Sequence, residues 1–450
     1  MTSARAGVAQ LEPPAELAPA TPAARERDAV GMLTVYLVLL CAVPSNQVLA
    51  PLASLGRPAF LWGLLLAFWW LVHRVQDRVG PPWPVWQPVR FMFGVLSVVV
   101  LVSFAYALLR GQPSDQVSPA FTSLLRMVSW AGVLLVTMDG IRTRRSLSVL
   151  RDRIVLAGVA LAILGLVQTA TRMQLVDLVP LPGFAASEEG GIQSRGSLVR
   201  AAGTATHPLE YAMFLTMAFA LALGKVSHRP LRGSGRAVVG RWFPVGVIGA
   251  ALFASASRSA LLAWVAVAVT MLPGMPRRTR AYSVAGAGVL GLAVVVAVPG
   301  LARTMLEMFT GASEDPSALS RTNALARAPG FISASPLVGT GFGTFLSRYQ
   351  IFDNEWVHLT VELGVLGILA FAGLLAAGVW SAYAARRDLR TDDVVAGGQA
   401  LMAAVAGGAL CFLGFDGLAF PIAAGGLFLV LGMCGALRAI ARTERQGLAR

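Results

Sequence analysis

The sequence predicts an all-α protein, a polytopic membrane helix bundle of about twelve transmembrane helices with a large outer loop bearing short helices. Three observations predict this fold class. Hydrophobic residues make up 56% of the 450 residues and charged residues only 13%, against about 45–50% and 25% in soluble domains. Long apolar stretches recur along the chain, and basic residues gather between alternate stretches. An ordinary soluble enzyme, a disordered chain and a disulfide scaffold are therefore excluded.

Twelve apolar stretches are candidate spans. Several are 17 to 22 residues long, enough to cross about 30 Å of hydrocarbon. The first is broken near its outer end by Pro44, Ser45 and Asn46, and the seventh and eighth form a tight hairpin. The approximate cores are 31–49, 58–73, 90–109, 120–139, 154–170, 208–224, 242–256, 259–273, 281–301, 356–382, 395–413 and 417–437.

The positive charge predicts how the bundle is oriented. With the N-terminus inside, 26 of the 37 basic residues fall in inside segments and ten in outside segments, while Arg126 lies within a span, where we expect a bundle-facing ion pair. Short inside loops of membrane proteins are enriched in Lys and Arg. The net charge of +14 therefore reports orientation, and no nucleic-acid partner is predicted. Both termini are predicted to be cytoplasmic, with long outer loops at 171–207 and 302–355.

The rest of the chain completes the predicted organisation. Residues 1–28 are rich in Ala, Pro and Glu without an apolar core, so we expect a disordered cytoplasmic tail and no cleaved signal peptide. Residues 29–440 form the transmembrane domain, and residues 441–450 form a second cytoplasmic tail. Residues 316–335 are predicted to form short helices over the outer membrane surface.

Ionisable residues gather at the outer ends of the spans, and such residues near lipid often mark functional sites. Four segments carry them, together with Asp416 on the last outer turn: VRAAGTATHPLEYA (199–212), SASRSALLA (255–263), RTNALARAPGFISASPLVGTGFGTF (321–345) and DNEWVHLTVELGVLG (353–367). Their ionisable and polar candidates are Arg200, His207, Glu210, Arg258, Arg321, Arg327, Asp353, Asn354, His358 and Glu362.

Purely structural explanations are open for several of these residues. Arg200 and Arg258 can place their charges among lipid headgroups, although outer arginines oppose the orientation bias. His207 precedes a proline and can cap a helix or belong to a loop. His358 and Glu362 are four residues apart on one helix face and can pair with each other.

Other motifs argue against cofactor chemistry. The run GTGFGTF (339–345) is similar to a phosphate-binding loop, but no strand precedes it and no GK[ST] follows, so a tight turn is predicted. The three cysteines, Cys41, Cys411 and Cys434, have neither metal-binding nor disulfide spacing. No Walker, HExxH, CxxC or GxSxG element is present, and neither a cofactor nor a metal is predicted.

In these four segments the sequence resembles the O-antigen ligase and polysaccharide polymerase superfamily of bacterial membrane glycosyltransferases. The resemblance covers roughly residues 30–440, with about twelve spans, a large outer loop before a late span, and the motifs in the same order. RAAGTATHPLEYA resembles the family's arginine-glycine segment, and SRSALLA resembles its Ser-Arg hairpin. PLVGTGFGTF and DNEWVHLTVELGVLG resemble the end of the large loop and the signature that follows it.

The resemblance implies transfer or polymerisation of a glycan from a polyprenyl-diphosphate-linked donor at the outer face of the cytoplasmic (inner) membrane, without nucleotide sugar or metal. The acceptor would be a glycan or glycolipid. Key arginines of the family correspond to Arg200 and Arg258. The family's ligases read His-Asn and then G-x-x-G in the last signature; aligned on its two glycines, Asp353 stands in the histidine's place and Asn354 follows. This departure favours a polymerase, or a ligase with another acceptor.

Elementary chemistry agrees with these roles. A diphosphate carries at least two negative charges, and arginine binds phosphate oxygens bidentately while staying charged. Stabilising the leaving diphosphate is most of the catalytic task, so Arg200 and Arg258 are predicted to be catalytic. Asp353 is predicted to be the base or positioning acceptor for the hydroxyl that attacks. The alternative explanation is that Asp353 is the N-cap of the helix that follows, a position that Asp favours. Membrane lipid would surround the polyprenyl tail. The predicted substrate-binding residues are Arg321, Arg327, His207, Asn354, His358 and Asp416.

Two other function classes compete with a glycosyltransferase. A transporter or lipid-linked glycan flippase suits twelve spans, but such proteins usually carry broken helices and charges near the membrane midplane. Here the charges gather at the outer ends of the spans, which favours catalysis there. A scaffold function in an envelope assembly machine would not explain why arginines gather on the outer side.

Overall fold

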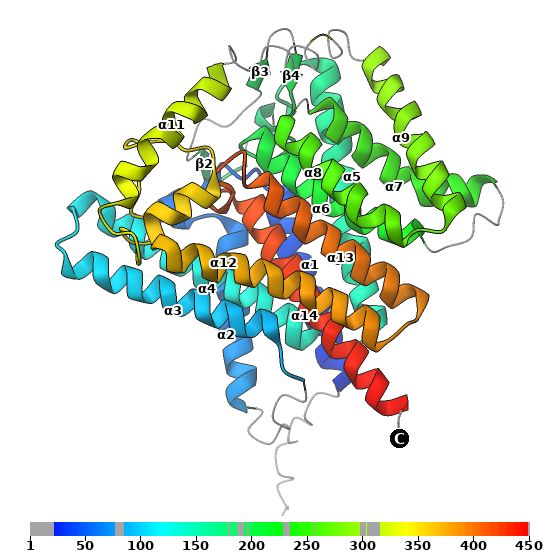
Figure 1. The fold of residues 1–450 in the computed structure, drawn as a ribbon, viewed down its shortest axis with the longest axis horizontal. Helices are drawn as coiled ribbons and strands as arrows, with labels where there is room; N and C mark the ends of the chain where they lie inside the picture. Colours follow the sequence, from blue (N-terminus) through cyan, green and yellow to red (C-terminus); the bar gives the residue numbers. More distant parts are fainter. Residues whose placement is uncertain are drawn as a thin grey trace, which may run out of the picture.

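Two helices, α6 (Pro208–Ser227) and α14 (Pro421–Leu448), lie at the centre of an all-α membrane bundle (Figure 1). Nearly every side chain of α6 is buried, and so is most of α14, including Phe214 and Phe428. The other helices surround this pair, which confirms the predicted fold class. The computed structural model describes residues 22–76, 85–178, 181–186, 193–195, 198–227, 235–255, 257–297, 303 and 316–448.

The surrounding helices follow the apolar stretches of the sequence. Within the described ranges, nine helices are long and apolar enough to span a membrane, and Val238–Ala254 and Arg258–Gly274 are shorter apolar helices. The exact count of twelve spans is therefore not confirmed. The surrounding helices are α1 (Pro22–Ala42), α2 (Pro58–Gln76), α3 (Pro88–Leu109), α4 (Ser114–Gly140), α5 (Arg144–Thr171), α7 (Gly235–Ala254), α8 (Arg258–Met271), α9 (Arg277–Ala297), α11 (Pro316–Ile332), α12 (Glu355–Asp388) and α13 (Asp392–Cys411).

The first helix differs from its prediction at both ends. Residues 22–28, predicted to be disordered, are helical, because Glu26 accepts hydrogen bonds from the Arg142 and Thr143 backbone N–H groups at 3.1 and 2.8 Å. This tertiary contact has no local sequence signal. Residues 1–21 of the predicted tail lie outside the described residues. The predicted span 31–49 ends early, at Ala42, two residues before the proline that interrupts it.

Two small two-stranded sheets lie in the segments between helices. Strand β1 (Gln47–Leu49) pairs antiparallel with β2 (Phe184–Ala186), and β3 (Gln193–Arg195) pairs antiparallel with β4 (Leu198–Arg200). The segment predicted as the outer loop 171–207 therefore contains strands in its described part. At the other end of the chain, α14 continues to Leu448, into the predicted tail 441–450.

Helix α12 is broken where the glycine-rich turn meets it. Gly364 has φ +65°, so the helix is interrupted there. The freed carbonyls of Val361 and Glu362 accept hydrogen bonds from the N–H groups of Thr340 and Gly341, both at 2.9 Å. Two carbonyls of the preceding loop in turn accept hydrogen bonds from the N–H groups of residues 365 and 366. Irregular backbone at membrane depth persists only when neighbouring protein satisfies it. The predicted tight turn is confirmed, since the glycines at 339, 341 and 343 all have positive φ.

The close backbone contact at this break predicts that one methyl group added at Gly339 lowers the stability of the fold strongly. A Cβ at Gly339, where φ is +71°, would overlap the backbone of Glu362. We expect Gly339→Ala to lower the free energy of unfolding by about 2 kcal/mol or more, from strain and overpacking together. Thermal unfolding of the purified protein in detergent measures this. The control is Gly330→Ala in α11, where an added Cβ meets no atom within 4 Å. Equal melting temperatures for the two variants would contradict the expectation.

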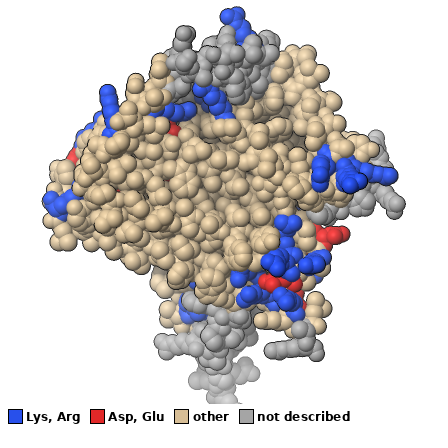
Figure 2. Space-filling model, in the orientation of Figure 1, with Lys and Arg blue, Asp and Glu red and all other residues tan. Residues whose placement is uncertain are grey.

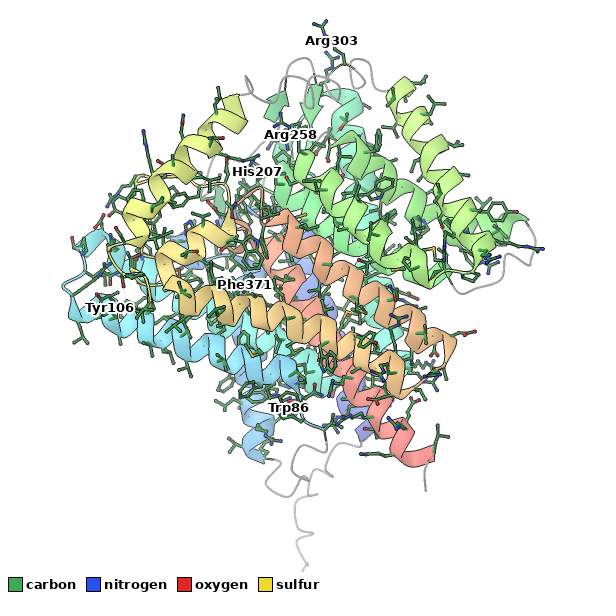
Figure 3. All side chains as sticks on the ribbon, viewed as in Figure 1. Trp86, Tyr106, His207, Arg258, Arg303 and Phe371 are labelled. Carbon is green, nitrogen blue, oxygen red and sulfur yellow. The ribbon has the colours of Figure 1, made fainter. Side chains whose placement is uncertain are left out.

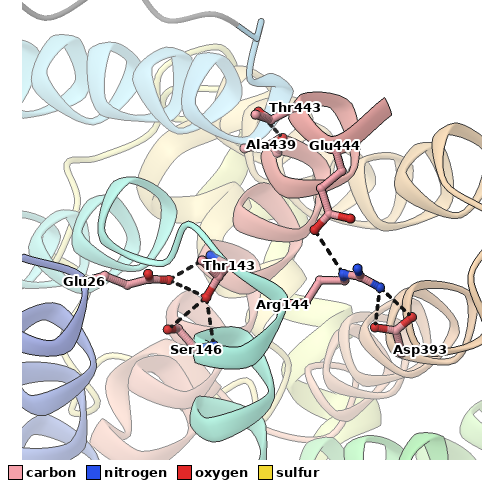
Figure 4. Close-up of polar contacts among 8 residues, drawn as sticks. All are labelled: Glu26, Thr143, Arg144, Ser146, Asp393, Ala439, Thr443 and Glu444. Carbon is pink, nitrogen blue, oxygen red and sulfur yellow. Dashed lines mark hydrogen bonds and ion pairs between the residues drawn. The ribbon is translucent and has the colours of Figure 1, made fainter. Parts of the chain in front are cut away.

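The surface separates an uncharged belt from charged ends. Figure 2 shows a broad uncharged face with Lys, Arg, Asp and Glu gathered at its edges. Large apolar side chains are exposed on several helices, for example Phe68 on α2 and Leu369 on α12, as expected for contact with lipid. At the end of the bundle near the C-terminus, Arg144 contacts Glu444 at 3.0 Å and Asp393 at 3.1 Å (Figure 4).

Candidate functional site

The first arginine of the predicted site reaches the turn that carries the second. Arg200 ends strand β4, and its Nε donates to the backbone carbonyl of Ser255 at 3.4 Å. Ser255 directly follows α7, and Arg258 begins α8 after the N-cap residue Ser257. The structure therefore brings Arg200 to the α7–α8 turn, in agreement with the tight hairpin that the sequence predicts. Figure 3 shows Arg258 and His207 at the same upper end of the bundle.

His207 lies near Arg200 and Arg321 as a neutral side chain. Its Nδ1 accepts a hydrogen bond from the Leu209 N–H at 3.1 Å, as in a helix cap. Burial, together with the positive charges of Arg200 and Arg321, lowers the pKa of His207 from its usual 6.5 to about 4. The imidazole is therefore uncharged near neutral pH. It can accept or donate a hydrogen bond there, but it adds no positive charge for an anion.

Asp353 pairs with an arginine of the large loop. Arg321 on α11 places its Nε 3.6 Å from Asp353 Oδ2 and donates from Nη2 to the Gly414 carbonyl at 3.0 Å. The Asp353 side chain remains 42% exposed, so a substrate can reach the carboxylate. Its backbone is left-handed, with φ +49°. The pair joins α11, the start of α12 and the last outer turn at one place.

The N-cap of α12 is Asn354, and the alternative explanation of Asp353 as the cap is wrong. Asn354 Oδ1 accepts from the N–H groups of Trp356 and Val357 at 3.1 and 3.3 Å. Its own N–H donates to Asp416 Oδ1 at 2.9 Å. Asn354 therefore has a structural role, while Asp353, one residue earlier, does not cap the helix.

Two other candidates lie away from this cluster or serve the fold. Arg327 is exposed on α11, and its Nη1 donates to Gln350 Oε1 at 3.3 Å. Glu210 is fully buried and accepts from the N–H groups of Ile422 and Thr206 at 2.7 and 2.9 Å. It thereby fixes the start of α14 to the segment before α6.

His358, Glu362 and Asp416 lie together in the wall of a cavity of about 380 Å³. His358 Nε2 is 3.4 Å from Glu362 Oε1, so the predicted pairing along the helix face is present. His358 Nδ1 is 3.9 Å from Asp416 Oδ2. Burial raises the pKa of the Asp416 carboxyl, against opposing effects of His358 and the Asn354 N–H. The cavity is lined by Ser54, Arg57, Ser118, Pro119, Thr122, Ser123, Arg126, Trp130, Phe342, Gly343, Phe345, Leu346, Ser347, Glu355, His358, Glu362, Asp416, Leu418 and Ala419.

Three ionisable lining residues were not among the candidates predicted from the sequence. Glu355 could have been found, because residues 355, 358 and 362 share one face of α12 at helical spacing. Arg126 was predicted only as a bundle-facing ion partner, and the structure places it in the cavity wall. Arg57 has no local signal, since it follows a short 3-10 helix and precedes α2.

Comparison with known families matches part of the chain. Residues 243–372 match the family model of O-antigen ligases. This range contains Arg258, Arg321 and residues 353–362, whereas Arg200, His207 and Asp416 lie outside it. No curated protein matches the chain. The match supports the O-antigen ligase superfamily that the sequence resembles, and the apolar helices agree with a multi-pass membrane protein.

Proposed function

We propose that this chain belongs to the O-antigen ligase superfamily. It transfers or polymerises glycan from a polyprenyl-diphosphate donor at the outer face of the cytoplasmic membrane. The observation that carries the proposal is the meeting of Arg200 with the α7–α8 turn of Arg258. Arg200 and Arg321, the partner of Asp353, both lie close enough to His207 to lower its pKa. Fixed guanidinium groups suit a diphosphate, because they bind its oxygens bidentately and remain charged. The polyprenyl tail would lie in lipid beside the apolar helices.

The reaction would be a single displacement at the anomeric carbon. The acceptor hydroxyl oxygen forms a bond to this carbon, the bond from the carbon to the diphosphate oxygen breaks, and polyprenyl diphosphate leaves with the electron pair. Arg200 and Arg258 would stabilise the charge on the leaving group without a metal. The proton of the acceptor hydroxyl would pass to the Asp353 carboxylate. The configuration at the anomeric carbon would invert.

A transporter or flippase remains the second candidate, and one observation favours it. Helix α12 is broken at Gly364, and His358 and Glu362 lie on the turns just before the break. Discontinuous helices that carry charged groups form substrate sites in many transporters. The exposed Asp353 at the start of the same helix favours chemistry at the outer face instead.

Purified protein given a defined polyprenyl-diphosphate glycan tests the proposal. We expect new glycosidic bonds and release of polyprenyl diphosphate. Comparing reactions with and without an added acceptor separates ligation, which needs the acceptor, from polymerisation, which does not. Mass spectrometry of the products detects both. Movement of the lipid across a vesicle membrane without any new bond would assign the chain to the flippase class.

The charge asymmetry predicts the topology that this function requires. A cysteine at Ser317 in α11 should react with a membrane-impermeant thiol reagent in intact cells, and one at Ser187 in the other outer loop should react as well. Arg145→Cys, at an exposed position near the start of α5, should react only after the cells are opened. Protection of both outer positions would contradict the orientation. The natural cysteines are buried and give a low background.

A further inference from the structure

The cavity beside the Asp353 cluster is large enough for a small ligand. Its volume of about 380 Å³ lies within the range of about 300–1,000 Å³ of small-molecule sites. Ser118 and Ser347 in its wall are exposed, so the cavity opens to the surface. The predicted diphosphate-binding Arg200 and Arg258 do not line it. It is therefore a separate compartment that adjoins the proposed reaction centre.

Three carboxylates in its wall are fixed in place by backbone hydrogen bonds. Glu355 Oε2 accepts from the Leu418 N–H at 2.8 Å, and Glu362 Oε1 accepts from the Phe345 N–H at 3.1 Å. Asp416 Oδ1 likewise accepts from a backbone N–H, that of the α12 N-cap residue. A carboxylate has about four acceptor positions, so each retains capacity toward the cavity. Fixed acceptors of this kind suit the several hydroxyl donors of a sugar ring.

His358 adds a buried ring nitrogen, Nδ1, that is available for a hydrogen bond. Its Nδ1 is buried, lies 3.9 Å from Asp416 Oδ2, and has no hydrogen-bond partner among the residues that the structure describes. This separation is too long for a direct hydrogen bond. One hydroxyl group inserted between the two atoms could contact both. A buried polar atom of this kind is a position at which a ligand hydroxyl or a water molecule can bind.

The remaining lining completes a surface suited to carbohydrate. Trp130, Phe342 and Phe345 offer apolar surface for the C–H groups of a sugar, and Thr122 and Ser123 offer hydroxyl groups. Apolar and aromatic surface combined with precisely placed polar groups is typical of specific small-molecule sites.

From this arrangement we infer that the cavity binds a saccharide, the acceptor of the transferred glycan. The inference rests on the proposed function and deepens it. Asp416 connects the two compartments, because it lines the cavity and is held by the residue next to Asp353. A saccharide in the cavity would extend one hydroxyl past Asp416 toward Asp353, while the diphosphate stays with the arginines.

Equilibrium binding of saccharides to the full chain tests this inference without turnover. The probe is the oligosaccharide mixture released by mild acid from the envelope of the producing cells, and native mass spectrometry identifies what binds. We expect the wild type to bind an oligosaccharide and the double variant Glu355→Gln, Glu362→Gln to bind it at least tenfold more weakly. Glu444→Gln makes the same change near the end of α14, where Glu444 contacts Arg144 (Figure 4) and does not line the cavity, and this variant should bind as the wild type does.

A second variant guards against misfolding of the buried double variant. Ser347→Trp places a large side chain at the exposed rim of the cavity and should also weaken binding at least tenfold. A wild type that binds no saccharide, or unchanged binding in both test variants, would overturn the inference. Glycan transfer with an unchanged acceptor KM in both variants would overturn it too, while leaving the proposed function intact. Saccharide binding without any transfer would overturn the proposed function, and with it the role of the saccharide as acceptor, while leaving the saccharide site itself.

Discussion

Arg200→Ala and Arg258→Ala should each abolish detectable glycan transfer while leaving the protein folded. Each change removes a charge-assisted contact to the diphosphate worth about 1.5–3 kcal/mol. The loss should be larger in the transition state, where charge develops on the leaving group and one donor is worth about 10²–10³ in rate. Single-turnover rates with a polyprenyl-diphosphate glycan measure this loss. Melting temperatures of the two variants check that the protein stays folded.

Lysine variants and a matched arginine sharpen this result. Arg200→Lys and Arg258→Lys should recover little activity, because an ammonium group lacks the planar fork that binds two phosphate oxygens. Arg303→Ala is the control, since Arg303 is exposed and lies at the uppermost end of the molecule in Figure 3, above Arg258. Normal turnover in both alanine variants would mean that the diphosphate binds elsewhere.

The sequence alone predicts the helices well because their apolar length is a local property. The runs that begin near Pro58, Pro88, Pro208 and Pro421 all become helices that begin at those prolines, where a missing N–H costs nothing. Hydropathy could not predict the break at Gly364, because the apolar run continues across it. The break depends on a loop more than twenty residues earlier that supplies the missing hydrogen bonds.

The candidate site was predictable in part from the family resemblance. The resemblance implied that Arg200 and Arg258 serve one site, and in the structure Arg200 reaches the α7–α8 turn that precedes Arg258. The sequence could not decide whether Asp353 or Asn354 caps α12, because Asp and Asn favour the N-cap position about equally. The cavity could not be predicted, because Arg57, Trp130 and Leu418 come together only through tertiary packing.

Asp353→Asn should slow the chemical step by about 10²–10⁴-fold with little change in donor binding. The amide keeps the shape of the carboxylate and loses its charge, so it cannot take the proton of the acceptor hydroxyl. The structure removes the competing explanation, because Asn354 caps α12 and remains in place. Asparagine also tolerates the left-handed backbone at this position, φ +49°.

Asp353→Asn should lower the stability of the fold so little that a slower reaction can be attributed to the lost carboxylate. The Arg321–Asp353 pair is 3.6 Å long with both side chains about a third or more exposed, and such pairs contribute about 0–1 kcal/mol. Asp353→His should retain part of the activity, since imidazole can accept a proton near neutral pH. Single-turnover rates at saturating donor, with melting temperatures as a folding check, measure both variants. Unchanged turnover in Asp353→Asn would exclude this carboxylate from the reaction and transfer the role of base to His358 or Glu362 in the cavity.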